Sequence, residues 1–273
     1  MSEYQIKPWE ELTIRDDYMF KLVMRRKRIC RKILERILGI EIADIHYLET
    51  EKSITAVYQG KGIRLDVYVK DDKETVYNIE MQVRKPEGEG LSKRTRYYQA
   101  MMDADLLAAG ADYDYLNPTI IIFICPFDPF GVGRYLYTFE NLCLEDRDIR
   151  LNDAATKIFL NTKGCVGEVN AGVRAFLAYV DGVMSDDMLV REIDDEIRKV
   201  KYIEGERVSY MTFAMKMMEE RKEGRAEGQR DERAAILRRL VTQSRIPLDQ
   251  AMDMIGIPVG EQPQYKDMVD VTR

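Results

Sequence analysis

Two short segments in the first third of the chain alternate between apolar and polar residues. They span residues 62–69 and 76–83 and are separated by a polar turn at 71–74. A period of two is typical of β-strands that bury one face. We expect the two segments to pair as an antiparallel hairpin with Asp66 opposite Glu80.

This register sorts the side chains of the hairpin onto two faces. One face is apolar and carries Ile63, Leu65, Val67, Val69, Tyr77, Ile79, Met81 and Val83. The other face is polar and carries Arg64, Asp66, Tyr68, Asn78, Glu80 and Gln82. Opposed side chains share a face with Cβ atoms about 5 Å apart, and opposed like charges are destabilising. The two carboxylates therefore favour a cation between them.

Helical and strand patterns also mark the rest of the first 165 residues. Helical spacing predicts a helix over 16–24, a second one ending at Leu38 before the cap Gly39, and a third over 91–109 before Gly110. The uninterrupted apolar run 119–125 predicts a central strand buried on both faces. Further strands are expected within 44–59, 135–139 and 156–160. Together these elements predict a mixed α/β domain over residues 1–165.

The pattern after residue 165 is helical. Helices are expected over 170–184, 185–218 and 234–244, and a short one from 246 to Gly256. The highly charged segment 219–232 indicates a solvated helix or linker, with a self-association helix as the alternative. The short helices leave open a helix-turn-helix that reads DNA. Residues 166–273 are thus expected to serve homo-oligomerisation or DNA contact.

Composition narrows the class of protein. Of the 273 residues, 45% are hydrophobic, which is enough for a packed core. No apolar run reaches about 18 residues and the N-terminus lacks a signal-peptide pattern, so we expect no membrane span. The four cysteines form no C-x-x-C pair, which indicates a reduced, cytoplasmic protein. The net charge of −6 argues against a uniformly basic nucleic-acid binder, although the first 100 residues carry a small basic excess.

The carboxylates of the hairpin suit a hard divalent cation. Mg²⁺ prefers oxygen ligands and commonly uses one or two carboxylates, with water and substrate oxygens filling the other positions. Asp66, Glu80 and the main-chain carbonyl of Met81 are the candidate ligands. The single histidine excludes a His-rich metal site, and the absence of a Gly-rich phosphate loop or dinucleotide fingerprint predicts no nucleotide cofactor.

The order of motifs resembles that of the PD-(D/E)XK nucleases, in which an Asp is followed by Glu-x-Lys on the next strand. Here the residues are Asp66 and then Glu80-Met81-Gln82. The wider pattern is similar to one branch, the PD-(D/E)XK nuclease family transposases, also called recombination-promoting nucleases. The matching segments are 17–21, 64–67, 78–82, 96–98 and 158–164, and the resemblance covers roughly residues 10–220.

The resemblance implies a restriction-endonuclease-like αβββαβ core and DNA cleavage that depends on Mg²⁺, with Mn²⁺ as a possible substitute. It also implies a role in DNA recombination or mobility. Asp66 and Glu80 then correspond to metal ligands, and Asp17 to the acidic residue of the first helix near the metal. Gln82 occupies the position of the superfamily lysine.

Glutamine at position 82 changes the expected chemistry. Its amide is neutral and cannot act as a base near pH 7, but it can hold a water molecule by hydrogen bonds. Lys21, Arg84 and Arg96 are candidates for a replacement cation. The residues expected to seat the DNA backbone are Lys21, Arg25, Arg26, Arg94 and Arg96, although the basic cluster 25–28 is equally well explained as a solvated face.

Two other functions remain open at this stage. The first is a DNA-binding or interaction module that kept the fold with weak or no catalysis. The second is a mainly structural protein whose helical C-terminus drives oligomerisation.

Overall fold

The computed structural model describes residues 6–50, 53–54, 62–86, 88 and 90–269. It is a mixed α/β structure with a central six-stranded sheet, which confirms the predicted mixed α/β class. The strands lie in the order β1 (Ile45–Thr50), β4 (Val67–Asp71), β5 (Val76–Met81), β6 (Thr119–Cys125), β8 (Ala155–Asn161) and β7 (Leu136–Phe139). The expectations for residues 1–5, 55–59, 87 and 89 lie outside the described residues.

The middle of the sheet is parallel and its two sides are antiparallel. Strands β5, β6 and β8 run parallel, while β1 and β4 on one side and β7 on the other pair antiparallel. Strand β6 has the predicted bounds, and nearly all its side chains are buried because helices cover both faces of the sheet. Parallel strands need such double cover, since neither face can be left to water.

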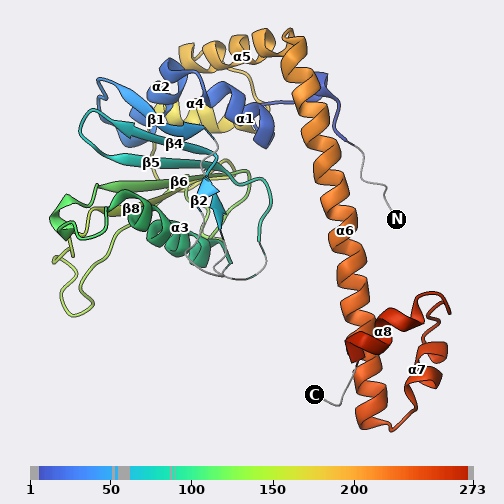
Figure 1. Ribbon diagram of the computed structural model, residues 1–273. Coiled ribbons are helices and arrows are strands. Elements are labelled where there is room, and N and C mark those ends of the chain that lie inside the picture. Colours follow the sequence, from blue (N-terminus) through green and yellow to red (C-terminus); the bar gives the residue numbers. More distant parts are fainter. Residues whose placement is uncertain (1–5, 51–52, 55–61, 87, 89, 270–273) are drawn as a thin grey trace. The chain divides into compact units, whose positions relative to one another are not determined.

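Helices form a layer on each side of the sheet (Figure 1). Helix α3 (Gly90–Leu106) lies on one face, where it contacts β6. On the other face lie α1 (Asp17–Met24), α2 (Lys27–Leu38), α4 (Ala171–Val180) and α5 (Met188–Lys201), which pack on one another. Helix α2 ends as predicted, because Gly39 adopts the left-handed conformation with φ of 68°.

The hairpin pairs in the predicted register, but its first strand is broken. Tyr68 pairs with Asn78 and Val67 with Ile79, which is the register that sets Asp66 against Glu80. The predicted continuous strand 62–69 is wrong, because the chain bends at Leu65 and Asp66. The part before the bend, β3 (Ile63–Arg64), pairs instead with β2 (Ser53–Ile54) in a separate two-stranded sheet.

The bend also changes which side chains share a face. Ile63 and Leu65 pack in one apolar cluster with Tyr68 and Phe123, on the α3 side of the sheet. The prediction that Ile63 and Leu65 lie with Val67 and Val69 is therefore wrong, because a bend in a strand resets the two-residue alternation. On the polar face of the hairpin, Tyr68, Asn78 and Glu80 are buried, whereas Asp66 and Gln82 are half-buried and Arg64 is exposed.

Most other predicted elements are present, with shifted ends. The helix expected over 91–109 ends at Leu106, and β7 and β8 lie where strands were predicted. Short 3-10 helices occupy Trp9–Glu11 and Tyr113–Tyr115. Helix α8 (Gln262–Val269) was not predicted, because its eight residues are too few for a clear helical period. Cys30 and Cys125 are buried free thiols, and no disulfide joins the described residues.

The chain divides into two compact units, one of which comprises Lys7–Arg207. The predicted boundary at residue 165 differs from this division, because α4 and α5 pack against α2 and belong to the same unit as the sheet. Among the described residues, no helix combines the length and apolar character required to cross a bilayer.

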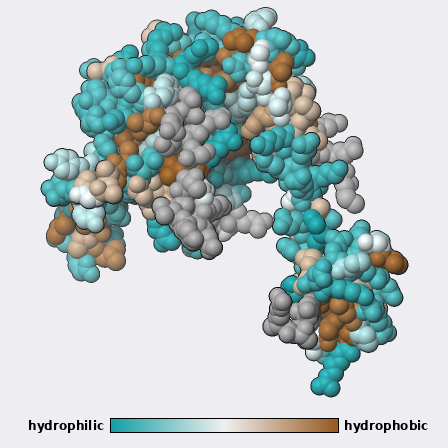
Figure 2. Space-filling view, in the orientation of Figure 1, coloured by the Kyte–Doolittle hydropathy of each residue, from teal (hydrophilic) through white to brown (hydrophobic). Residues whose placement is uncertain are grey.

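The second unit comprises Val208–Arg273 together with the first six residues. It holds most of α6 (Glu204–Gln243), followed by α7 (Leu248–Met254) and α8. These helices enclose a small core of their own, made of Ala234, Leu237, Ala251, Met252, Ile257, Tyr265 and Val269. The segment 219–232, expected to be a solvated helix or linker, is helical and exposed. On the face shown in Figure 2, the surface of the protein is mostly hydrophilic with separate hydrophobic patches.

Candidate metal and nucleic-acid site

The two carboxylates of the hairpin meet at the end of the sheet where β5 finishes and β4 begins. Glu80 is the penultimate residue of β5, and its side chain is only 6% exposed. Asp66 lies in the bend before β4, and its main-chain N–H donates a hydrogen bond of 3.1 Å to Oε1 of Glu80. The bend frees that N–H from strand pairing, so the side chain of Glu80 is its acceptor.

Helix α1 adds a cation to this pair. Lys21 Nζ lies 3.0 Å from Asp66 Oδ1 and 3.0 Å from Asp17 Oδ2, one helical turn earlier. The Lys21 side chain is buried with 8% exposure, whereas Asp17 is 42% exposed. Burial alone would lower the pKa of Lys21, but the charges of Asp66 and Asp17 outweigh it and the pKa is raised. Lys21 is thus an ammonium ion bridging two carboxylates.

The electrostatics of the site disfavour two free carboxylates. Burial, with repulsion from Asp66, raises the pKa of Glu80 to about 8, although Arg94 and Asn78 act in the opposite direction. Burial, with repulsion from Asp17, raises the pKa of Asp66 to about 6, against the attraction of Lys21. A desolvated carboxylate accepts a proton readily unless a cation compensates its charge. The positive charges of Lys21 and Arg94 therefore do not fully offset the burial and mutual repulsion of the carboxylates.

Gln82 lies just beyond the end of β5 and is held at both ends of its amide. Its main-chain N–H still bonds to the sheet through Ile124 O at 2.9 Å. The side-chain Oε1 accepts a hydrogen bond from Nη2 of Arg94, and Nε2 donates to the main-chain carbonyl of Arg84. The chain bends at Arg84, so the strand does not extend far enough to place Arg84 on the face of Glu80.

Arg94 comes from α3 and rests on aromatic rings of the core. Its guanidinium carbon lies 4.8 Å from the ring centre of Phe123 and 5.4 Å from that of Tyr98. Phe123 is the partner of Glu80 in the parallel register between β5 and β6, so both point toward α3. The guanidinium therefore lies on the same side of the sheet as Glu80, against the rings of Phe123 and Tyr98.

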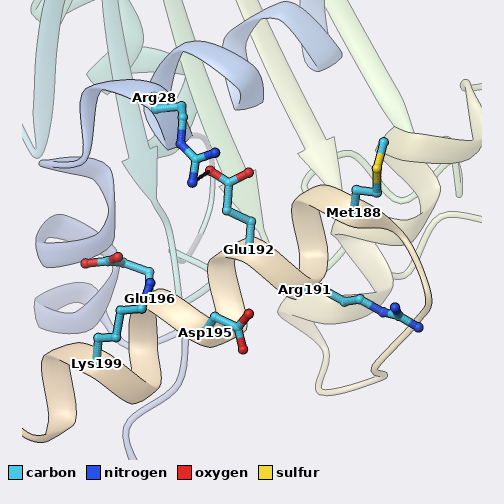
Figure 3. A pocket seen from close by; sticks show the side chains of 7 residues that line it. All are labelled: Arg28, Met188, Arg191, Glu192, Asp195, Glu196 and Lys199. Carbon is cyan, nitrogen blue, oxygen red and sulfur yellow. Dashed lines mark ion pairs between the residues drawn. The ribbon is translucent and has the colours of Figure 1, made fainter.

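The basic cluster at the start of α2 is used within the fold. Arg26 pairs with Glu196 of α5, and Arg28 and Lys32 both pair with Glu192. Figure 3 shows Arg28 reaching across to Glu192 above a small pocket lined mostly by α5 residues. Arg36, further along α2, forms a similar ion pair: its Nη1 lies 2.6 Å from Oδ1 of Asp187. The part of the cluster that faces α5 thus stabilises helix packing.

Comparison with known proteins places the chain in a family. Residues 14–235 match the family model described as PD-(D/E)XK nuclease family transposase. The chain belongs to this family. The match confirms the resemblance noted in the sequence and extends over both the sheet and most of α6. Comparison with curated proteins and with solved structures found no match.

Nucleases of the PD-(D/E)XK superfamily generally use divalent metal ions. In this chain the carboxylates of Asp66 and Glu80 are the side chains that would hold such an ion. Asp66 and Glu80 adjoin each other, and Met81 directly follows Glu80 at the end of β5. Within the described ranges, no group of three or more His, Cys, Asp or Glu side chains is arranged to hold a metal. Two carboxylates with a cation deficit match the small protein ligand set that Mg²⁺ uses.

Sequence reasoning missed how Arg94 and Phe123 contribute to the site. Arg94 was expected to contact DNA, but it faces the sheet, while Arg96 is exposed. A signal for this was present, since Arg94 precedes Tyr98 and Met102 at successive four-residue steps of one helical stripe. A charged residue in line with an apolar stripe indicates a buried polar contact.

Proposed function

We propose that this nuclease-family transposase is a Mg²⁺-dependent DNA endonuclease that hydrolyses phosphodiester bonds, with a role in DNA recombination or mobility. One observation carries the proposal: the half-buried Asp66 and the buried Glu80 adjoin at the end of the sheet, joined by the hydrogen bond from Asp66 N–H to Glu80 Oε1. The restriction-endonuclease-like αβββαβ core is part of the same proposal, and the chain order of α2, β1, β4, β5, α3 and β6 supports it.

Asp66 and Glu80, with the carbonyl of Met81, are the proposed ligands. A bound divalent cation would act as a Lewis acid on the phosphate and template an in-line attack by water. The amide of Gln82 positions that water, because its oxygen can accept and its nitrogen can donate one more hydrogen bond each. Lys21 keeps Asp66 ionised, and Asp17 holds the Lys21 ammonium in place.

Exposed basic residues lie on three segments that carry residues of the site. Arg64 precedes Asp66 by two residues, Arg84 follows Gln82 by two, and Lys93 and Arg96 lie on the first turns of α3. Basic side chains at the rim of a site bind the phosphate backbone without reading sequence. We assign DNA seating to this basic rim because it is exposed and adjoins Asp66, Gln82 or Arg94 in the chain. Arg26 joins the start of α2 to α5 through its ion pair with Glu196.

The test is cleavage of supercoiled plasmid by the purified full-length chain. Wild type is expected to nick DNA with Mg²⁺ or Mn²⁺ and not with EDTA, and Asp66→Ala to lose this activity. Asp114→Ala, at an exposed aspartate in the 3-10 helix before β6, is the matched control and should nick normally. Equal nicking by wild type and Asp66→Ala would show a contaminating nuclease and refute the assignment.

A second candidate is a DNA-binding module without catalysis. The observation that favours it is the Lys21 ammonium, which already supplies a cation between Asp17 and Asp66. This candidate predicts salt-sensitive DNA binding that is indifferent to Mg²⁺ and no metal-induced rise in melting temperature.

A further inference from the structure

One strongly charged group near the carboxylates has no role in the ligand set. The Arg94 guanidinium is half-buried, stacks on Phe123 and Tyr98, and bonds to Gln82. Its Nε is buried and has no hydrogen-bond acceptor in the part of the chain that the structure describes. Burying an arginine with an unsatisfied donor costs free energy. Such a cost is unusual at a position where an apolar side chain would pack as well.

The partner of Arg94 is the residue that takes the place of the superfamily lysine. The Oε1 atom of Gln82 accepts from Arg94, while Nε2 is tied to the Arg84 carbonyl. The two bonds fix the orientation of the amide, because only the oxygen can accept from a guanidinium. A lysine at position 82 could not accept this bond, and its ammonium would repel Arg94. Glutamine is therefore the side chain that suits a neighbouring arginine.

The charge of Arg94 reaches the proposed metal ligand. Glu80 and Phe123 are register partners, and the guanidinium covers the Phe123 ring at 4.8 Å. The field of Arg94 accordingly favours the ionised carboxylate of Glu80. A positive charge therefore lies near Glu80, as it would with a lysine at position 82, but here the charge belongs to Arg94 of α3.

We propose that Gln82 and Arg94 together replace the superfamily lysine: Arg94 supplies the positive charge, and its bond to Gln82 fixes the amide that positions the attacking water. Arg94 is then a positioning residue of the cleavage reaction. This inference rests on the proposed nuclease function. It also explains why a family member with glutamine at this position retains a cation in the site.

Lysine at position 82 should therefore support cleavage only when the charge of Arg94 is removed as well. Arg94→Met keeps an unbranched side chain over Phe123 but removes the charge, and should lower kcat for plasmid nicking by about 100-fold. Gln82→Lys alone places an ammonium against the guanidinium, and should lower both activity and melting temperature. The double variant Gln82→Lys/Arg94→Met restores one cation, and should be at least tenfold more active than Arg94→Met and melt above Gln82→Lys.

Two further variants separate positioning from packing. Arg94→Lys retains the charge and should keep more activity than Arg94→Met. Arg174→Met removes another guanidinium that stacks on a ring, 5.2 Å from the centre of Tyr135, and should leave nicking unchanged. Melting temperatures measured without metal report the coupling between positions 82 and 94 independently of catalysis.

The outcomes distinguish this inference from the function on which it rests. If wild type nicks DNA but the folded double variant is no more active than Arg94→Met, the paired replacement is refuted and the nuclease assignment stands. The same holds if Gln82→Lys melts and cleaves like wild type, since the two cations would then not meet. If wild type does not nick DNA at all, the nuclease function fails and this inference with it.

Discussion

The main-chain N–H of Asp66 donates a 3.1 Å hydrogen bond to the carboxylate of Glu80. This bond exists because the strand bends at Asp66 and releases its N–H from the sheet. It holds the two acidic side chains together although they belong to different strands.

Replacing Glu80 by glutamine should separate stability from metal binding. The amide Oε1 at position 80 can still accept the hydrogen bond from the main-chain N–H of Asp66. Burying a neutral amide costs less free energy than burying a charged carboxylate. Glu80→Gln is therefore expected to melt at a higher temperature than wild type near pH 8 without metal. It should also lose the Mg²⁺-induced rise in melting temperature, and about 100-fold or more in nicking. A Mg²⁺ response equal to that of wild type would contradict the ligand role.

The metal-free protein should lose stability as the pH rises. Burial raises the pKa of Glu80 from 4.5 to about 8 and that of Asp66 from 3.8 to about 6. The folded chain then binds more protons than the unfolded chain between these values, so its stability falls from about pH 4 to pH 8. Because Mg²⁺ binds the ionised pair, its stabilising effect should grow over the same window. Thermal unfolding across this range, with and without MgCl₂, measures both trends. Melting temperatures that do not change with pH would contradict the raised pKa values of Glu80 and Asp66.

Removing the charge of Lys21 should be far costlier than removing that of an exposed lysine. Lys21→Met leaves Asp66 and Asp17 facing each other without a cation, and a broken buried pair costs about 3 kcal/mol in the free energy of unfolding. Lys163, whose side chain is 56% exposed, pairs with Asp181 at 2.7 Å. Lys163→Met should cost less than about 1 kcal/mol. Urea unfolding of both variants gives the comparison, and similar losses would contradict the bridging role.

Single basic residues should differ in their effect on DNA binding. Arg96→Ala is expected to weaken binding of unrelated duplexes alike and to reduce the slope of log K against log salt concentration by about one. Arg26→Ala should leave the slope unchanged, since Arg26 is engaged with Glu196. Fluorescence anisotropy over a salt series, in EDTA to prevent cleavage, measures the slopes. A reduced slope for Arg26→Ala and an unchanged slope for Arg96→Ala would instead assign DNA-backbone binding to the basic cluster at the start of α2.

The two compact units should respond separately to core mutations. Leu237 is fully buried in the small core of α6, α7 and α8. Leu237→Ala should destabilise that unit by about 2–5 kcal/mol. Plasmid nicking should persist at temperatures where the unit of Lys7–Arg207 is folded. Differential scanning calorimetry with a nicking assay tests this, and loss of nicking in parallel with the C-terminal transition would contradict independence.

The amino-acid sequence alone determined the local elements with strong periodicity. The apolar run of β6, the helical stripe of α2 before Gly39 and the alternation that pairs Val67 with Ile79 each depend on residues close in the chain. The same alternation located Asp66 and Glu80 together, because antiparallel register follows from the pattern of one hairpin. The family resemblance added Asp17 and Gln82 as candidates.

Only the tertiary structure decided which charges meet. The bend at Asp66, the insertion of Lys21 between two carboxylates and the stacking of Arg94 on Phe123 join segments that are distant in sequence. Likewise, Arg26 and Glu196 are 170 residues apart, and no periodicity links them. Side-chain pairs of this kind form where helices pack on a sheet, so their partners are set by packing geometry, which local patterns do not encode.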